Sequence, residues 1–358
     1  MSRKWIAGIM AGLLAMAVLA GCGKSATDQQ GGQSQQQSQQ GSAEGEKKPF
    51  KAAMATDVGG INDQSFNASA WRGLQKLKEE IGAEVNYVES KRQEDYETNL
   101  ATLADQGYNI VWGVGFLMTN AIGAVADQYP DTYFGLIDGE VQGKPNVVSV
   151  LFNEQEGSFL MGVFAAKTTK TGKVGFVGGM ELPVIERFEA GFKAGVKAVN
   201  PNVQVITVYT GEFNDPEKGK AAALNIYGQG ADVIFHASGK TGEGVIQAAK
   251  EQNKFAIGVD SDQNHLAPEH VISSMMKRVD VAVLTISKQA AEGNFPGGQT
   301  VVLGLKDNGV GWSDTTLWDK MPPDTKEVAT KWAEAIKAGK VTVPSTRKEL
   351  ETWQVPEI

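Results

Sequence analysis

Short runs of β-branched and apolar residues alternate along the chain with longer segments of helical periodicity, from Phe50 onward. The runs predict ten strands, at residues 51–56, 84–89, 109–113, 132–137, 147–152, 173–177, 203–209, 232–235, 255–259 and 271–275. The intervening segments are amphipathic and predict helices. In the first of them Phe66, Ala70, Leu74 and Leu77 share one face. Regular alternation of this kind is typical of an α/β fold, in which helices cover both faces of parallel sheets.

Ten strands over roughly 300 residues suit two doubly wound lobes better than one sheet. We expect the chain to pass from one lobe to the other near Asn153, to return near 276–280, and to cross again near 307–312. The N-terminal lobe would then comprise approximately 49–153 and 278–310. The C-terminal lobe and closing segment would comprise approximately 154–277 and 311–358.

The first 48 residues have the features of an exported lipoprotein. A basic start at residues 2–4 precedes an uncharged, apolar stretch at 5–20, which is typical of a signal peptide. The stretch ends in Leu19-Ala20-Gly21-Cys22, similar to the bacterial lipobox, in which a lipid such as palmitate is attached to the cysteine. We therefore expect a signal peptide at 1–21, lipidation of Cys22, and a flexible Gln/Ser/Gly tether over 22–48. The alternative is an uncleaved membrane anchor.

Composition and charge exclude several classes of protein. The net charge is −8, whereas a nucleic-acid-binding protein usually has a basic surface. A single cysteine cannot form an internal disulfide or a Cys-rich zinc site, and three histidines leave little for a metal cluster. Residues 238–241 lack the first glycine of a P-loop, and residues 260–271 lack the glycine and glutamate of a calcium loop. We expect no catalytic residue, metal or cofactor, and therefore a binding protein rather than an enzyme.

Polar and aromatic residues gather directly after the predicted strands. In open α/β sheets ligands bind beyond the carboxyl ends of the strands, so these residues are the candidates for a binding site. They are 57–60, 89–90, 115–116, 138–139, 178–179, 211–213, 238–240 and 260–262. Glycine allows close approach of the backbone to a ligand, and carboxylates accept hydrogen bonds from N–H and O–H groups.

An ordered set of motifs resembles the basic membrane protein family, which includes bacterial purine nucleoside receptors. The motifs are TDVGGINDQSFN at 56–67, GVGF at 113–116, FNEQEG at 152–157, GFVGG at 175–179, GFxAG at 191–195, FNDP at 213–216, GKTGxGV at 239–245 and GVDxDQ at 258–263. The resemblance covers nearly all of the chain after Phe50. It implies the type I periplasmic-binding-protein fold, with two doubly wound parallel-sheet lobes joined by a multi-strand hinge, in a substrate-binding lipoprotein of an ABC transporter.

The resemblance also implies ligand-binding roles for seven residues: Asp57, Phe66, Asn120, Phe213, Gly239, Asp260 and Lys277. Asp57 and Asn120 would hold the edge of a purine that Phe66 and Phe213 sandwich. Gly239 would offer a backbone contact, and Asp260 and Lys277 would hold the ribose hydroxyls. Stacking on an aromatic side chain contributes about 1–3 kcal/mol per base, which makes such walls effective.

Structural alternatives remain open for several of these residues. Asp57 and Asp63 could cap the helix that starts near Ser65. Phe66 could belong to the core, and Asn120 could be a solvated helix residue. The rivals of two other candidates are Phe235 for Phe213 and Arg278 for Lys277, and Lys277 or Arg278 could simply pair with Asp280.

These observations predict a monomeric protein, lipid-anchored at the outer face of the cell membrane, or on the periplasmic side where an outer membrane exists. It would capture purine nucleosides such as adenosine, guanosine or inosine and deliver them to an ABC permease. The alternatives are the same scaffold with riboflavin or another small solute, a surface sensor or adhesin, and an extracytoplasmic nucleoside hydrolase.

Overall fold

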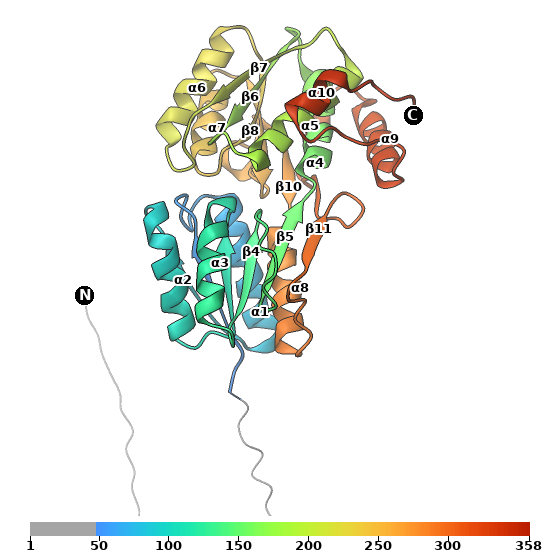
Figure 1. The fold of residues 1–358 in the computed structure, drawn as a ribbon. Helices are drawn as coiled ribbons and strands as arrows, with labels where there is room; N and C mark the ends of the chain where they lie inside the picture. Colours follow the sequence, from blue (N-terminus) through green and yellow to red (C-terminus); the bar gives the residue numbers. More distant parts are fainter. Residues whose placement is uncertain (1–47) are drawn as a thin grey trace, which may run out of the picture. The chain divides into compact units, whose positions relative to one another are not determined.

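Two six-stranded sheets organise residues 48–358, the part of the chain that the computed structural model describes (Figure 1). The first sheet has the spatial order β11 (Thr300–Leu303), β5 (Val147–Phe152), β4 (Tyr133–Ile137), β3 (Ile110–Val114), β1 (Lys51–Thr56) and β2 (Glu84–Glu89). The second has the order β12 (Val310–Trp312), β10 (Val271–Lys277), β9 (Phe255–Asp260), β8 (Val233–Ala237), β6 (Lys173–Gly178) and β7 (Gln204–Tyr209). Neighbouring strands are parallel, except that β12 runs antiparallel to β10.

Helices cover both faces of each sheet. Those of the described residues are α1 (Phe66–Ile81), α2 (Tyr96–Asp105), α3 (Thr119–Gln128), α4 (Glu154–Thr168), α5 (Pro183–Val199), α6 (Pro216–Gly228), α7 (Thr241–Glu251), α8 (Val279–Ala291), α9 (Thr325–Lys337) and α10 (Arg347–Thr352). Side chains of β1 alternate between two cores: Ala52 and Met54 pack with α1 and α8, while Ala53 and Ala55 pack with α2 and α3. This period of two is what a strand buried on both faces requires.

The second lobe is built in the same way, with α6 and α7 on one face of its sheet and α4 and α5 on the other. Helices α4 and α5 pack with their backbones in close approach. A Cβ atom at Gly195 of α5 would lie 1.9 Å from the main-chain oxygen of Phe159 in α4, and one at Gly191 would lie 2.2 Å from that of Gln155. Glycine is required at both positions because no other residue fits the space.

The chain passes between the two sheets three times. It leaves the first sheet after β5 and enters α4, returns after β10 into α8, and crosses again between β11 and β12. Both lobes therefore contain segments that are distant in the sequence. In Figure 1 the two lobes are seen one above the other, with β5 and β10 pointing toward their junction.

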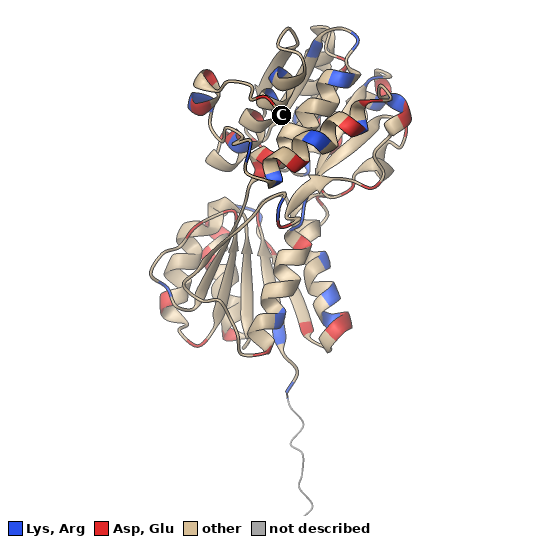
Figure 2. Cartoon of the chain, turned by 90° about the vertical axis from the view of Figure 1, so that its right-hand side faces the viewer, with Lys and Arg blue, Asp and Glu red and all other residues tan. Residues whose placement is uncertain are grey.

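The predicted α/β fold with two doubly wound lobes is confirmed, and each of the ten predicted strands is present with ends within two residues. Two strands, β11 and β12, are not among the predicted ones, and the antiparallel edge strand β12 departs from the expected all-parallel arrangement. Figure 2 shows acidic and basic residues interspersed over the helices of both lobes. This mixture agrees with the absence of a strongly basic composition.

Candidate functional site

A cavity lies between the lobes, at the carboxyl ends of β1, β3 and β4 in the first sheet and of β8, β9 and β10 in the second. Its empty volume, counted out to the mouth, is about 610 Å³. Ligand pockets commonly enclose about 300–1,000 Å³. The residues that line it are Asp57, Gly59, Asp63, Phe66, Asn67, Gly115, Phe116, Leu117, Asp138, Leu182, Val184, Ile185, Phe188, Phe213, Ala237, Ser238, Gly239, Val259, Asp260 and Lys277. Both lobes contribute, so a ligand held here would contact both.

The loop after β1 holds two buried carboxylates in different ways. Asp63 accepts hydrogen bonds from the main-chain N–H groups of Ser65, Asn67 and Ala68, at 2.7–3.0 Å, and so caps the start of α1. Asp57 does not cap the helix. Its Oδ1 accepts bonds from the N–H of Gly59 at 2.8 Å and the amide of Asn67 at 2.7 Å.

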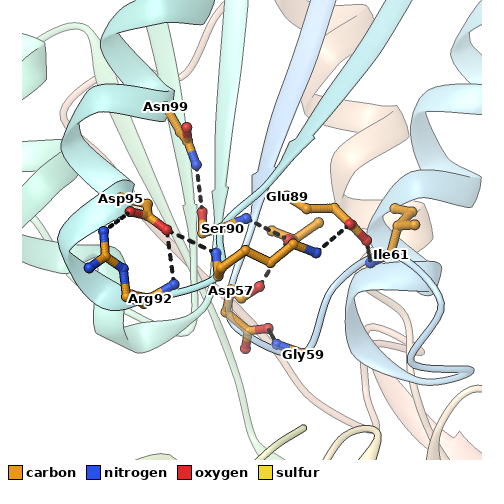
Figure 3. A network of polar contacts seen from close by, with 10 residues as sticks. Asp57, Gly59, Ile61, Glu89, Ser90, Arg92, Asp95 and Asn99 are labelled. Carbon is orange, nitrogen blue, oxygen red and sulfur yellow. Dashed lines mark hydrogen bonds and ion pairs between the residues drawn. The ribbon is translucent and has the colours of Figure 1, made fainter.

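Neighbouring strand ends hold this loop in place (Figure 3). The N–H of Ile61 donates to the Glu89 carboxylate at 2.9 Å, from the end of β2. Within residues 48–358 the hydrogen bonds of the Asp57 carboxylate use only Oδ1, which leaves Oδ2 as an acceptor at the cavity. Burial raises the pKa of Asp57 to about 6, although the Asn67 hydrogen bond opposes this.

Asp260 lies at the contact between the lobes. Its Oδ2 accepts a hydrogen bond from the Ser65 hydroxyl of the first lobe at 2.5 Å. Further bonds cross between the lobes here: Ser261 Oγ donates to Ser65 O at 2.9 Å, Gln263 Nε2 donates to Gln64 O at 3.2 Å, and Arg72 donates to Ser261 Oγ at 2.8 Å. Burial raises the pKa of Asp260 to about 7, against the opposing effects of Lys277 and the Ser65 bond. Asp260 therefore lines the cavity and also links the two lobes through a hydrogen bond.

Lys277, at the end of β10, is 1% exposed and also bridges the lobes. Its ammonium donates to Asp138 Oδ2 of the first lobe at 2.6 Å and forms an ion pair with Glu154 Oε1 at 2.9 Å. Burial disfavours the charged lysine, but the neighbouring carboxylates outweigh this and raise the pKa of Lys277 above its usual value. Its neighbour Arg278 pairs instead with Asp280.

Aromatic side chains form the apolar walls. Phe66 enters the cavity from the start of α1 and Phe213 from the loop after β7, so each lobe supplies one of the two predicted rings, and Phe116 and Phe188 add a further ring from each lobe. Gly179 makes room for Phe213, because a Cβ atom there would lie 2.3 Å from the ring. Phe235, the sequence rival of Phe213, is fully buried in the core and packs against Phe176.

The backbone is strained at two of the cavity carboxylates. Asp138 and Asp260 have φ angles of 68° and 62°, in the left-handed region that non-glycine residues seldom adopt. Gln64, whose carbonyl accepts a bond from the other lobe, has a φ angle of 52°. Such strain persists where the surroundings over-determine the conformation, and it clusters at binding sites.

The structure brings six of the seven predicted ligand-binding residues to one cavity: Asp57, Phe66, Phe213, Gly239, Asp260 and Lys277. Asn120, in the first turn of α3, is exposed and is not among the lining residues. Sequence reasoning did not select Asp138 as a ligand residue, although it follows directly after a predicted strand. Phe188 gave no sequence signal that separates it from an ordinary helix residue, and Asn67 was noted only as the last residue of the motif at 56–67.

No group of three or more His, Cys, Asp or Glu side chains within residues 48–358 is arranged to hold a metal ion. Over the same range no helix combines the length and apolar character that crossing a membrane requires. The expected signal peptide, lipidated Cys22 and tether lie outside the described residues, apart from Lys48.

A family model described as "ABC transporter substrate-binding protein PnrA-like", Bmp, matches residues 50–345. The chain belongs to the Bmp family. A Bmp-family relative in Lactococcus lactis, named "ABC transporter nucleoside-binding protein BmpA", is 37% identical over 366 residues, which cover 96% of this chain and all of that protein. A "CD4+ T-cell-stimulating antigen" of Listeria innocua is 40% identical over 348 residues, covering 91% of this chain and 94% of the relative.

A solved structure gives the same assignment for the Bmp-family fold. An ABC transporter solute-binding protein of Aeropyrum pernix K1 superposes with a TM-score of 0.78 at 31% identity, covering 85% of this chain and 96% of that one. Because the Bmp family consists of substrate-binding proteins of ABC transporters, this chain is a binding protein and not an enzyme.

Proposed function

We propose that this Bmp-family protein captures purine nucleosides between its lobes and delivers them to an ABC permease. The observation that carries the proposal is the cavity itself, in which each lobe supplies a phenylalanine and strand ends supply hydrogen-bond acceptors. A nucleoside has a flat base with edge donors, joined to a sugar with adjacent hydroxyls. The aromatic walls suit the base, and the carboxylates suit the donors. The name of the Lactococcus relative supports the same ligand class.

The charges around the cavity favour a ligand without negative charge. Asp57, Asp63, Asp138 and Asp260 line it together with one cation, Lys277. A phosphate ester would face these carboxylates in a buried, weakly screened site and would be repelled. We therefore expect nucleosides to bind and nucleotides to be rejected.

Closure of the lobes gives the permease a form to recognise. Phe66 belongs to the first lobe and Phe213 to the second, so a base between them would favour the closed arrangement. The hydrogen bonds of Ser65 with Asp260 and Ser261 would then add to the same state.

Attachment to the outer face of the cell membrane belongs to the same proposal. The lipobox-like sequence before Cys22 supports a lipid anchor, with the tether giving a reach of roughly 25–30 Å. In cell fractionation the parent protein should sediment with membranes, whereas Cys22→Ser should not acquire lipid. Equal fractionation of the two proteins, with no lipid on the parent, would contradict the anchor.

Isothermal titration calorimetry tests the ligand. Protein refolded to remove carried-over ligand is titrated with adenosine, guanosine, inosine, a pyrimidine nucleoside, riboflavin and a purine nucleoside monophosphate. We expect one-to-one binding of the purine nucleosides. Binding of riboflavin alone would leave the assigned fold unchanged but replace the proposed ligand. If the protein is folded and none of the compounds binds, the nucleoside proposal is refuted.

A further inference from the structure

Four buried or half-buried charges form a chain that starts at the cavity and runs into the second lobe. Asp138 accepts from Lys277 at 2.6 Å, Lys277 pairs with Glu154 Oε1 at 2.9 Å, and Arg187 Nε donates to Glu154 Oε2 at 2.6 Å. The signs alternate along the chain. Only its first two members, Asp138 and Lys277, line the cavity.

Glu154 and Arg187 lie at positions where burying an ion pair removes charged groups from water and so costs free energy. Glu154, the first residue of α4, is 0% exposed, and the Arg187 side chain on α5 is 24% exposed. Burying an ion pair costs about as much in lost hydration as its attraction returns, so stability alone is a weak reason for it. Burial would raise the pKa of Glu154, but Lys277 and Arg187 outweigh burial and hold that pKa below its usual value.

The same pair restricts where the Lys277 ammonium can lie. Glu154 attracts it from the side of the second lobe, and Asp138 from the side of the first. Aromatic rings of Phe66 and Phe152 enclose it, with each centroid 5.1 Å from Nζ. One of its three N–H groups donates to Asp138 and another faces Glu154 Oε1 at 2.9 Å, so Lys277 retains one donor for a ligand.

Asp138 offers the complementary acceptor. Its Oδ1 is buried and has no hydrogen-bond partner among residues 48–358, while its Oδ2 is held by Lys277. An unpaired buried carboxylate oxygen is costly, and a ligand donor would relieve that cost. A hydroxyl group both donates and accepts, so it matches a lysine N–H beside a carboxylate oxygen.

We propose that Glu154 and Arg187 are positioning residues, which act through Lys277 and Asp138 to select ligands that carry sugar hydroxyls. The inference rests on the proposed function and deepens it. Neither residue touches the ligand. They hold the lysine between the lobes with a free donor, beside the free oxygen of Asp138.

The test measures the affinities of inosine and of 2′,3′-dideoxyinosine for the full-length parent protein and for its Glu154→Gln variant. Losing one charge-assisted contact typically weakens binding by about tenfold or more. For inosine we expect a loss of this size in Glu154→Gln. For the dideoxy compound we expect a change of less than about twofold, because it lacks the 2′ and 3′ hydroxyls that Lys277 and Asp138 would hold. Equal weakening for both compounds would mean a general structural role and would overturn the inference.

Arg187 supplies a second comparison, which decides the matter if Glu154→Gln does not fold. Arg187→Met should reproduce the selective loss for inosine, and Arg187→Lys should restore much of it. The matched control is Lys193→Met on the same helix, which breaks an ion pair with Glu189 away from the cavity and should leave the ratio of the two affinities unchanged. If the parent protein binds no purine nucleoside, the proposed function has failed. If the parent protein binds purine nucleosides and every variant keeps the parent's ratio of the two affinities, the proposed function stands and only this inference has failed.

Discussion

Replacing Asp260 by asparagine (Asp260→Asn) should stabilise the ligand-free protein, with a gain that grows as the pH rises. Asp260 is 6% exposed, and burial raises the pKa of its carboxyl from the ordinary 3.8 to about 7. Asparagine has the same shape, tolerates the left-handed backbone and can accept the Ser65 hydrogen bond, but it does not ionise.

The magnitude follows from the difference between the two pKa values. A carboxyl whose pKa is raised on folding contributes stability that is fully present below pH 3.8 and is lost as the pH rises through about 7. One pKa unit corresponds to about 1.4 kcal/mol, so the whole difference amounts to about 4 kcal/mol of unfolding free energy. By the same relation Asp260→Asn should gain about 2 kcal/mol at pH 5 and about 4 kcal/mol at pH 8.

Thermal melts of ligand-stripped protein between pH 5 and pH 8 measure this gain. For a chain of this size about 2 °C in Tm corresponds to 1 kcal/mol, so the Tm difference should rise from about 4 °C to about 8 °C. The control is Asp319→Asn, at an exposed position, for which the difference should stay small at every pH. A Tm difference for Asp260→Asn that stays constant or shrinks with rising pH would refute the burial argument.

Three other perturbations probe separate parts of the structure. Gly179→Ala should weaken nucleoside binding by about tenfold, since its Cβ would displace the Phe213 ring that we propose stacks on the base, and calorimetry measures the loss. Lowering the pH from 7.5 to 5 should weaken nucleoside binding of the parent protein, because Asp57, with a pKa of about 6, becomes protonated and its acceptor oxygens bind N–H donors less strongly. Gly195→Ala should lower the unfolding free energy by about 3 kcal/mol in urea titrations, because it forces α4 and α5 apart.

Matched controls separate these effects from general damage. Gly228→Ala adds a Cβ that meets no atom within 4 Å and should leave both binding and stability close to the parent values. Asp57→Asn should lose most of the pH dependence of binding between 7.5 and 5, apart from the part contributed by Asp260. An affinity of the parent protein that rises on acidification would contradict the assigned role of the carboxylates.

The strands that build the two sheets were predictable because each carries its own signal. Residues 110–114 and 233–237, for instance, are buried throughout and read as short apolar runs. β11 and β12 carry no such signal. The residues of β11 alternate between exposed and half-buried, and both strands form at sheet edges against partners far away in the sequence. Their pairing depends on the finished lobes and not on local preference.

For the candidate site, too, the sequence predicted some of the residues and missed others. Strand ends pointed to Asp57 and Asp260, since ligands bind at the carboxyl ends of parallel strands. The pairing of Lys277 with Asp138 could not be foreseen, because it joins strand ends from different lobes and depends on how these lobes meet. The space that Gly179 leaves for an aromatic ring is likewise visible only in three dimensions.

The triple crossing between the sheets determines the order in which the molecule can be completed during synthesis. The first lobe has five of its six strands once β5 has been made, but α8, which packs against α1, and the edge strand β11 come only after β10 of the second lobe. Until then the side of α1 that packs against α8 lacks its cover. A growing chain therefore cannot finish one lobe before starting the other, and the contacts between distant segments slow folding. Delayed folding of this kind keeps the chain extended for longer, which is the form that threads through a narrow membrane pore.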